Sequence, residues 1–318
     1  MTWRNGSWAV LVVLATACGG TSNVELPDGG PGPDATSPPD GGNPTDAGPP
    51  SDGPLPPVDG AGPEGGNVDS GAFSPTNLKG LALWLDAEHK TALDGNGRLQ
   101  TWGDLSGNAN DASQATSTSR PGLLSQAINN LPAVHFEGAS SGPYLSVADS
   151  STMQWGTGDF LVALVARFSN NPTSGLTTGA GDFFWKSTFN GTNGAGVGFL
   201  ANIPTANYTV ATGLALSINS TNYVFTQTAY NDGAGRLYLT RRIGTTLELR
   251  VNASSVATQT GTATDVSASG TPALIGAIGN GVYYRLAGDI SEMIAVKGPI
   301  SDPDLTSLEA YLKGKYGL

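Results

Sequence analysis

Short runs of alternating apolar and polar residues recur from residue 80 onward, and turn-forming Gly, Asn and Asp residues separate them. Many short, closely spaced strands with no helical stretch between them indicate antiparallel sheets in a sandwich or a barrel. The predicted strands are 80–86, 99–102, 133–137, 144–147, 160–168, 182–186, 196–201, 208–218, 223–230, 236–243, 246–252, 256–260, 273–278 and 283–296.

Two connections carry the signal of a β-hairpin. Residues 231–235 read Asn-Asp-Gly-Ala-Gly, which tolerate a left-handed backbone, and Gly244-Thr245 separates two alternating runs. Within 236–243, residues 236, 238 and 240 alternate with residues 237, 239 and 241, as a half-buried strand requires. We therefore expect hairpins at both positions.

The one convincing helix lies at the C-terminal end. Ser301 is a suitable N-cap, Pro303 lies in the first turn, and Asp302 and Asp304 place negative charge at the positive end of the helix dipole. Gly317 supplies a C-terminal stop. Leu305, Leu308 and Leu312 share one face, with Tyr311 beside them, so we expect this helix to pack on the sandwich.

The N-terminal segment has the pattern of a secretory signal peptide. Residues 1–17 place Arg4 before a short apolar stretch and small residues before Cys18. The stretch from Leu14 to Cys18 resembles the lipobox of bacterial lipoproteins, although Leu14 lies one position earlier than that family prefers. The resemblance implies lipidation of Cys18 and a membrane anchor. The alternative is an ordinary signal peptide followed by a free thiol.

Residues 18–72 have the composition of a spacer. Between residues 19 and 72 there are twelve prolines, nine acidic residues and no Lys or Arg. Such a segment buries too little apolar surface to offset its ordering entropy, so we expect a disordered linker. It also holds much of the negative charge: residues 73–318 keep 17 acidic and 14 basic residues (26 minus 9, and 15 minus 1).

The composition excludes several classes of protein. The chain has 318 residues, one Cys and two His. These numbers exclude an intrachain disulfide scaffold and Cys-rich clusters, and they argue against a His-rich metal enzyme. The net charge of −11 argues against nucleic acid as the main partner, because few cations remain to neutralise phosphates. No apolar run reaches about 18 residues, so we expect no membrane-spanning helix.

Several motifs follow one another in a set order within residues 73–318. They are GLALWLDA at 80–87, TWGDLSGN at 101–108, NDA at 110–112, LPAV at 131–134, GDISEM at 288–293 and EAYLKGKYGL at 309–318. This ordered set resembles bacterial LamG-like jelly-roll domains of the concanavalin A-like lectin/glucanase superfamily. The resemblance implies an all-β fold in which two antiparallel sheets form a jelly-roll sandwich, with one sheet concave and often the ligand face. A short C-terminal helix completes the expected fold, and the disordered linker precedes it.

Exposed aromatic rings are the candidates for carbohydrate binding, because sugar rings stack on flat aromatic faces. Each ring taken alone is more often part of the core, and we assign Trp84 to the core. Adjacent strand residues point to opposite faces, so one of Tyr283 and Tyr284 should face outward. The candidate ligand-binding residues are Trp102, Trp155, Trp185, Tyr208, Tyr283 and Tyr284.

One loop has the oxygen-rich composition that suits calcium. Asp104, Asn108, Asn110 and Asp111 place hard oxygen ligands in a Gly-containing segment, although the EF-hand order is missing. The alternative, which we favour, is a loop of Asx-turns in which these side chains bind their own backbone.

No catalytic residue is assigned from the sequence. Asp86 and Glu88 could share a strand face, whereas Asp289 and Glu292 are three apart and should not. The E-x-D-x-x-E run of β-glucan hydrolases on this fold is absent, as is a nucleophile elbow. His89 and His135 are expected to be structural.

These observations predict a lipid-anchored protein of the bacterial cell envelope, at the outer membrane or cell surface. Its lectin-like domain would bind carbohydrate or another extracellular polymer without catalysis. Two alternatives stay open: a structural or protein-interaction module without lectin activity, and a glycoside hydrolase or lyase with an unrecognised site.

Overall fold

The computed structural model describes residues 73–138, 142–169, 181–189, 193–201, 213–219, 222–261 and 263–318. The predicted signal peptide, Cys18, the predicted linker and Tyr208 lie outside these residues. Within the described part of the chain, no helix has the length and apolar character needed to cross a membrane.

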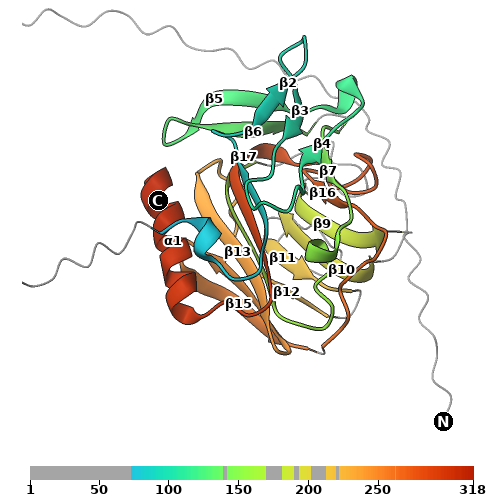
Figure 1. Ribbon diagram of the computed structural model, residues 1–318. Helices are drawn as coiled ribbons and strands as arrows, with labels where there is room; N and C mark the ends of the chain where they lie inside the picture. Colours follow the sequence, from blue (N-terminus) through green and yellow to red (C-terminus); the bar gives the residue numbers. More distant parts are fainter. Residues whose placement is uncertain are drawn as a thin grey trace, which may run out of the picture. The chain divides into compact units, whose positions relative to one another are not determined.

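Two antiparallel sheets form a β-sandwich (Figure 1). Sheet A has eight strands in the order β15-β14-β13-β8-β17-β6-β5, with β1 also paired to β17. Its strands are β1 (Leu81–Asp86), β5 (Gly122–Ile128), β6 (Leu131–Glu137), β8 (Phe160–Phe168), β13 (Arg236–Ile243), β14 (Thr246–Val251), β15 (Ser254–Thr260) and β17 (Ala287–Lys297).

Sheet B has nine strands in the order β12-β11-β10-β9-β16-β7-β4-β3-β2. Its strands are β2 (Thr91–Leu93), β3 (Leu99–Trp102), β4 (Ala112–Ser113), β7 (Leu145–Val147), β9 (Gly181–Phe189), β10 (Asn193–Ala201), β11 (Leu214–Ser217), β12 (Tyr223–Phe225) and β16 (Ala273–Ile275). Three short 3₁₀ helices, η1 (Pro75–Asn77), η2 (Ser117–Ser119) and η3 (Ser151–Met153), lie in the connections.

The main core fills the space between the two sheets. Aliphatic side chains make up most of it, and aromatic rings pack among them: Phe183 lies 5.3 Å from Phe168 and 5.4 Å from Tyr238, measured between ring centroids. Burial of rings and β-branched side chains on alternate strand positions provides the apolar area that holds the sheets together.

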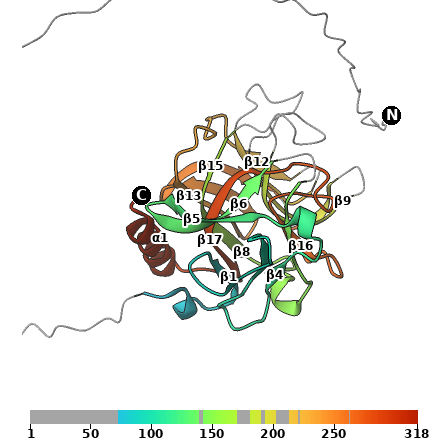
Figure 2. The ribbon, with the colours of Figure 1, turned by 90° about the horizontal axis from the view of Figure 1, so that it is seen from above.

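The C-terminal helix forms a third layer on the outer face of sheet A. Helix α1 (Asp302–Tyr316) begins after the N-cap Ser301 and ends at Gly317, which adopts the left-handed conformation. Its residues Leu305, Leu308 and Leu312 pack on the outward side chains of β8, β13 and β17. Figure 2 shows α1 on one side of β13 and β17, with β9 and β16 on the other. The helix therefore converts a solvent-facing sheet surface into a second apolar core.

A β-bulge in β17 places two acidic residues on the outer face of sheet A. Asp289 pairs with Arg167 and Glu292 pairs with Val165, so Ser291 is the extra residue. Without a bulge, residues three apart point to opposite faces. The expectation that Asp289 and Glu292 do not share a face is therefore wrong.

Glu292 ties α1 to sheet A. Its carboxylate is completely buried and accepts four hydrogen bonds, from Trp84 Nε1 (2.8 Å), Tyr311 Oη (3.0 Å), Tyr316 Oη (3.0 Å) and Lys315 Nζ (3.0 Å). Lys315 Nζ also lies 2.7 Å from Oδ2 of Asp86, the cross-strand neighbour of Glu292. Burial raises the pKa of the Glu292 carboxyl, although the charge of Lys315 opposes that shift. The positive charge of Lys315 thus stabilises the Glu292 carboxylate, whose charged form burial alone would disfavour.

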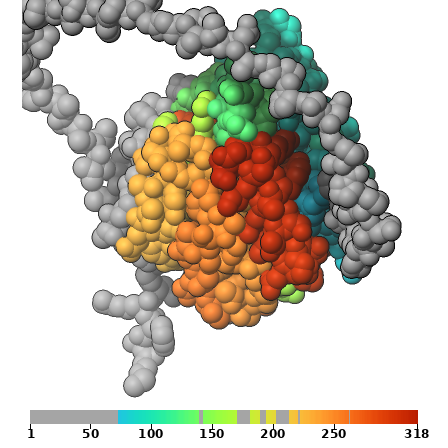
Figure 3. All heavy atoms as spheres, turned by 90° about the vertical axis from the view of Figure 1, so that its left-hand side faces the viewer, coloured from blue at the N-terminus to red at the C-terminus, as the bar shows by residue number. Residues whose placement is uncertain are grey.

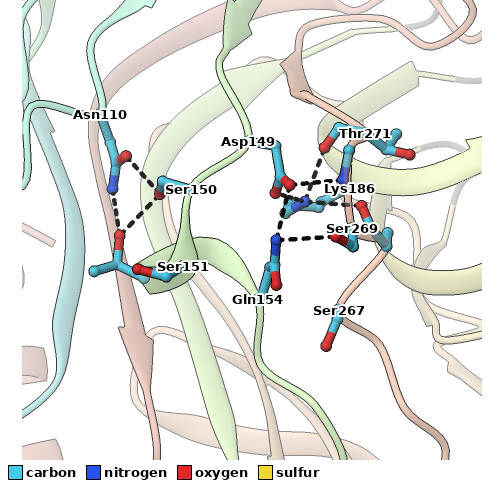
Figure 4. Close-up of polar contacts among 12 residues, drawn as sticks. Asn110, Asp149, Ser150, Ser151, Gln154, Lys186, Ser267, Ser269 and Thr271 are labelled. Atoms are coloured by element: carbon cyan, nitrogen blue, oxygen red, sulfur yellow. Dashed lines mark hydrogen bonds and ion pairs between the residues drawn. The ribbon is translucent and has the colours of Figure 1, made fainter.

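A second cation, fully buried on the interior strand β9 of sheet B, joins two connecting segments. Lys186 on β9 is fully buried, and its Nζ donates to Asp149 Oδ1 and to the Thr271 carbonyl, both at 2.8 Å (Figure 4). Gln154 donates to Asp149 Oδ2 at 2.8 Å. Every group in this cluster has a protein partner, so the cluster fixes the segments before β8 and β16.

Two details of the predicted topology are wrong. Residues 231–235 do not form a hairpin: β12 belongs to sheet B and β13 to sheet A, so this segment crosses between the sheets. Local turn chemistry cannot show which sheet the next strand joins. The last predicted strand, 283–296, begins too early, since β17 starts at Ala287. Tyr283 instead pairs with Ile278 in an isolated β-bridge before that strand. The hairpin at Gly244-Thr245 is confirmed by the pairing of Ile243 with Thr246.

We predict that replacing Lys315 with Met destabilises the protein by about 3–5 kcal/mol, because two buried carboxylates lose their cation. Lys313→Met is the matched control: it removes a Lys from the same last turn, where we expect a loss of about 1 kcal/mol or less. Urea unfolding at neutral pH measures both. Equal losses in the two variants would contradict the role given to Lys315.

Candidate functional site

Three charged side chains form a row across adjacent strands on the outer face of sheet A. Asp289 on β17 pairs in register with His135 on β6 and with Arg167 on β8. Nδ1 of His135 lies 2.6 Å from Asp289 Oδ1, and Nε of Arg167 donates to Asp289 Oδ2 at 2.5 Å. The row is rigid because each member belongs to a central strand.

Asp289 is the buried member of the row. Its side chain is 6% exposed, whereas those of His135 and Arg167 are 37% and 35% exposed. Burial by itself would raise the pKa of the Asp289 carboxyl, but hydrogen bonds from His135 and Arg167 outweigh it and the pKa falls below its ordinary value. The hydrogen bond to Asp289 raises the pKa of the His135 imidazole, although partial burial opposes this shift.

The carboxylate of Asp289 also sets the orientation of its two partners. An ionised carboxylate only accepts hydrogen bonds, so the His135 nitrogen that faces it, Nδ1, carries a proton. Arg167 uses Nε on Asp289 and Nη1 on the Ala127 carbonyl at 3.0 Å. Among the described residues, neither His135 Nε2 nor Arg167 Nη2 has a hydrogen-bond partner. These two nitrogens are available to a ligand.

The row lines an open hollow of about 400 Å³. Glu137, Ser169 and Gly233 also line it. A neighbouring hollow of about 260 Å³ shares Arg167 and Gly233 with the first and extends to Tyr316, Gly317 and Leu318 at the end of the chain. Figure 3 faces the side that carries α1 (red), which borders the β5–β6 segment (green). The two hollows adjoin at Arg167 and Gly233, and we call them together the sheet A groove.

The segment containing Gly233 forms one side of this groove. The Gly233 amide donates to the Phe168 carbonyl at 3.0 Å, which fixes the crossing segment at the end of β8. Gly233 has a φ of +76°, a conformation that side chains rarely adopt. The turn residues that predicted a hairpin therefore form the crossing segment, which lines the groove beside Arg167.

The three tryptophans among the predicted ligand-binding residues lie in the interior. Trp102 is 0% exposed, Trp155 is 3% exposed and Trp185 is 2% exposed. Trp155 stacks on Phe160 with ring centroids 5.3 Å apart. Their ring faces are covered by protein, so they are not available for stacking on a sugar.

Tyr283 and Tyr284 are both half-buried. They lie against Trp185, Leu200 and Leu274, a small cluster on the face of sheet B that points away from the main core. The structure brings together three of the predicted aromatic residues there and leaves Trp102 and Trp155 apart from them. Tyr208 lies outside the described residues.

The predicted calcium loop is closed by protein hydrogen bonds. The Asp104 carboxylate is buried and accepts from the amides of Trp84 (3.0 Å), Ser106 (2.9 Å) and Asn110 (3.0 Å), and from the Ser106 hydroxyl (2.6 Å). Asp111 accepts from the Asp104 amide at 2.7 Å. This geometry favours the alternative of Asx-turns.

The two amides of the same loop bind the backbone of β1. Asn108 Nδ2 donates to the Leu81 carbonyl at 2.9 Å, and Asn110 Nδ2 donates to the Ala82 carbonyl at 2.7 Å. Across the described ranges of the chain, no three His, Cys, Asp or Glu side chains are grouped so that they could hold a metal ion. Calcium binding by this loop stays a prediction without geometric support.

Asp86 and Glu88 belong to the anchoring of α1. Lys315 Nζ lies 2.7 Å from Asp86 Oδ2 and 3.1 Å from Glu88 Oε2, and His89 Nδ1 lies 2.9 Å from Asp86 Oδ2. Lys315 on α1 contacts both acids, and His89 contacts Asp86 from the segment after β1, so this pair has a structural role here.

Sequence reasoning missed the sheet A groove. It treated His135 as structural and did not consider Arg167, although Arg167 is the only charged residue in β8. A charged residue in an otherwise apolar central strand was the available signal. The row forms because the sheet topology brings three separate strands side by side. The sequence alone does not show this strand order.

No protein-family model matches the sequence, and a search of curated proteins finds no match. Solved structures do resemble it. The binding domain of Paraclostridial Mosquitocidal Protein 1 aligns with a TM-score of 0.53 at 9% identity, over 75% of this chain and 53% of that one. A Trypanosoma rangeli sialidase in complex with sialic acid aligns with a TM-score of 0.50 at 11% identity, over 74% of this chain and 33% of that one.

Domain 4 of the GH43 extracellular arabinanase AbnA from Geobacillus stearothermophilus, in complex with arabinotriose, has a TM-score of 0.49 and 13% identity, over 72% of this chain and 98% of that domain. The chain thus spans about half of the mosquitocidal binding domain's length and a third of the sialidase's. At these identities the likeness shows the fold, a two-sheet β-sandwich, and the argument for function depends on the site.

We predict that His135→Gln destabilises the protein more at about pH 5.5 than at about pH 9. A raised histidine pKa contributes stability that is present below the unfolded value and is lost as pH rises through the folded one. The depressed pKa of Asp289 keeps its carboxylate charged down to lower pH, so the pair contributes most between about pH 4 and 6.5. Thermal unfolding across this range measures the difference.

His89→Gln is the control for this prediction. It removes the same group from a pair in which the histidine side chain is 61% exposed and therefore screened by water. A pH dependence of His135→Gln no larger than that of His89→Gln would count against the proposed coupling between His135 and Asp289.

Proposed function

We propose that this chain is a carbohydrate-binding module that recognises an extracellular polysaccharide through the sheet A groove. The observation that carries the proposal is the row of His135, Asp289 and Arg167, which presents two unused nitrogens in an open depression. Binding is the role that such fixed, outward-facing polar groups support best.

The chemistry of the groove suits sugar hydroxyls. A hydroxyl donates one hydrogen bond and accepts others, so it needs both kinds of partner. Arg167 supplies donors, Glu137 supplies acceptors, and His135 Nε2 accepts or donates according to its protonation. The second hollow, which continues past Arg167 to the end of the chain, gives room for more than one sugar unit. An extended polymer fits this arrangement better than a small ligand does.

The ion pairs of the two acidic residues in the hollow favour a binding role over hydrolysis. Asp289 and Glu137 both line the hollow, but Asp289 is bound to His135 and Arg167, and Glu137 lies 3.0 Å from Arg98. A glycosidase needs one carboxyl that stays protonated as the general acid. The pKa of the Asp289 carboxyl is instead shifted downward. We therefore propose that the module binds without cleaving its ligand.

The fold comparisons are consistent with this proposal. One similar structure is described as a binding domain, and the similar sialidase was determined with sialic acid bound. The β-sandwich is also used for many other purposes, so these similarities support the proposal without replacing a direct test.

We predict that Ser169→Trp weakens polysaccharide binding strongly, because a bulky side chain at this exposed position fills the hollow without changing its charge. Ser169→Ala is the matched control and should bind like the unchanged protein. Affinity electrophoresis of the full chain against a panel of neutral and acidic polysaccharides measures the effect. If the unchanged protein binds no member of the panel, the proposal fails and a protein-interaction module is favoured.

We also propose that the module is held at a bacterial membrane by a lipid on Cys18, with residues 19–72 as the spacer. This follows from the lipobox-like stretch before Cys18 and from the proline-rich, acidic composition after it. Export and acylation of Cys18 would hold the domain outside the cytoplasmic membrane, in compartments where polysaccharides occur.

We predict that Cys18→Ser moves the protein from the membrane fraction to the soluble fraction, since the serine hydroxyl cannot form the thioether that carries the lipid. Fractionation and metabolic labelling with a fatty acid analogue measure the change. A Cys18→Ser protein that still sediments with membranes would contradict the anchor and leave the proposed binding site unaffected.

A further inference from the structure

We propose that the sheet A groove recognises a carboxylate, so that its ligand is an acidic polysaccharide built from uronic or similar acid sugars. This inference rests on the proposed binding function and restricts its ligand to polysaccharides that carry carboxylates. The juxtaposition of Arg167 Nη2 and His135 Nε2 around one buried carboxylate carries it.

The geometry provides two cationic donors on one rigid support. His135 and Arg167 flank Asp289 on adjacent strands, and each uses its inner nitrogen on that residue. Their remaining nitrogens lie in the hollow, where they have no partner among the described residues. A planar carboxylate can accept from a guanidinium and an imidazolium at once, and such charge-assisted bonds are stronger than those to hydroxyls.

The charges around the hollow leave a positive excess when His135 is protonated. In the described part of the chain, Asp289 on β17, Arg167 on β8 and Glu137 on β6 carry the charges near His135, and Arg98 lies 3.0 Å from Glu137. The Arg98–Glu137 and Arg167–Asp289 pairs each sum to zero. Protonated His135 therefore contributes the unmatched charge, which a ligand carboxylate would neutralise.

Nonspecific attraction cannot explain such binding. The full chain has a net charge of −11, so an acidic polymer is repelled by the protein as a whole. Any affinity for an acidic polysaccharide has to come from a local site that overcomes this repulsion. Variants of the groove are thus expected to weaken this binding, because no general attraction would replace the lost contacts.

The affinity for an acidic polymer should also depend on pH, because His135 can lose its charge. The pKa of His135 is raised by Asp289, so the imidazole keeps its positive charge into less acidic solution than an isolated histidine would. When it loses that charge, Nε2 becomes an acceptor that faces the ligand carboxylate. Affinity for an acidic polymer is therefore expected to fall as pH rises, while a neutral ligand would show no such trend.

The test compares polygalacturonate with its fully methyl-esterified form, which has the same backbone without the charge. We expect the full chain to bind polygalacturonate and to bind the ester at least about tenfold more weakly. Arg167→Gln should weaken polygalacturonate binding by about ten- to a hundredfold. Lys79→Met, which removes an exposed cation away from the groove, is the control and should have no effect.

Two further variants separate recognition from folding. Arg167→Gln combined with Asp289→Asn removes the ion pair without leaving a buried charge, so a folded double variant that no longer binds supports the inference. Arg167→Lys keeps the charge and should retain part of the affinity. His135→Gln should abolish the decline in affinity between about pH 5.5 and 8.5.

The outcomes distinguish the two proposals. Equal binding of the acid and the ester would overturn the carboxylate inference and leave carbohydrate binding standing. Binding to neither form, nor to any other polysaccharide, would overturn the proposed function. Equal binding of poly-aspartate would show that the groove recognises acidic polymers in general, which contradicts a polysaccharide ligand.

Discussion

The extra residue at Ser291 in β17 determines how the outer face of sheet A is used. Strand β17 lies at the centre of the sheet and pairs with β1, β6 and β8. Because the bulge shifts the register there, Asp289 and Glu292 both project from the same face. One of them organises the charged row and the other anchors α1, so a single irregularity in one strand supports both the groove and the third layer of the fold.

The two carboxylates have opposite pKa shifts because their surroundings differ. Glu292 is covered by α1 and fully buried, and burial dominates, so its pKa rises although Lys315 is near. Asp289 lies at the floor of an open hollow, where hydrogen bonds from His135 and Arg167 outweigh burial and its pKa falls. Cover by the helix therefore separates a structural acid from one at the floor of the groove. Only the smaller of the two hollows reaches the end of α1, at Tyr316, Gly317 and Leu318.

Local signals in the sequence predicted the elements that depend on local physics. The N-cap Ser301 and the stop at Gly317 define α1, and the apolar run 160–168 is β8. The sheet to which β13 belongs, and the position where β17 begins, depend on contacts between residues far apart in the chain. The candidate site depends on such contacts entirely, because His135, Arg167 and Asp289 are brought together only by strand order. Burial of the Asp182 carboxylate, which has no hydrogen-bond partner among the described residues, likewise could not be predicted from its neighbours in the sequence.

The polar clusters in this fold differ in how much hydrogen-bonding capacity their atoms have left. A cluster whose atoms are all paired within the protein has a structural role, whereas one with unpaired donors can bind a ligand. In the loop around Asp104, the carboxylate accepts four protein hydrogen bonds, and in the cluster around Lys186 the ammonium binds a carboxylate and backbone carbonyls. Glu292 is satisfied in the same way. Such groups gain nothing from a ligand, because a new contact would have to replace an existing one. Of the clusters described above, the row at Asp289 keeps donors directed at solvent. Residue type alone suggested the acidic loop and the tryptophans as candidates, whereas the remaining hydrogen-bonding capacity supports the role proposed for the groove.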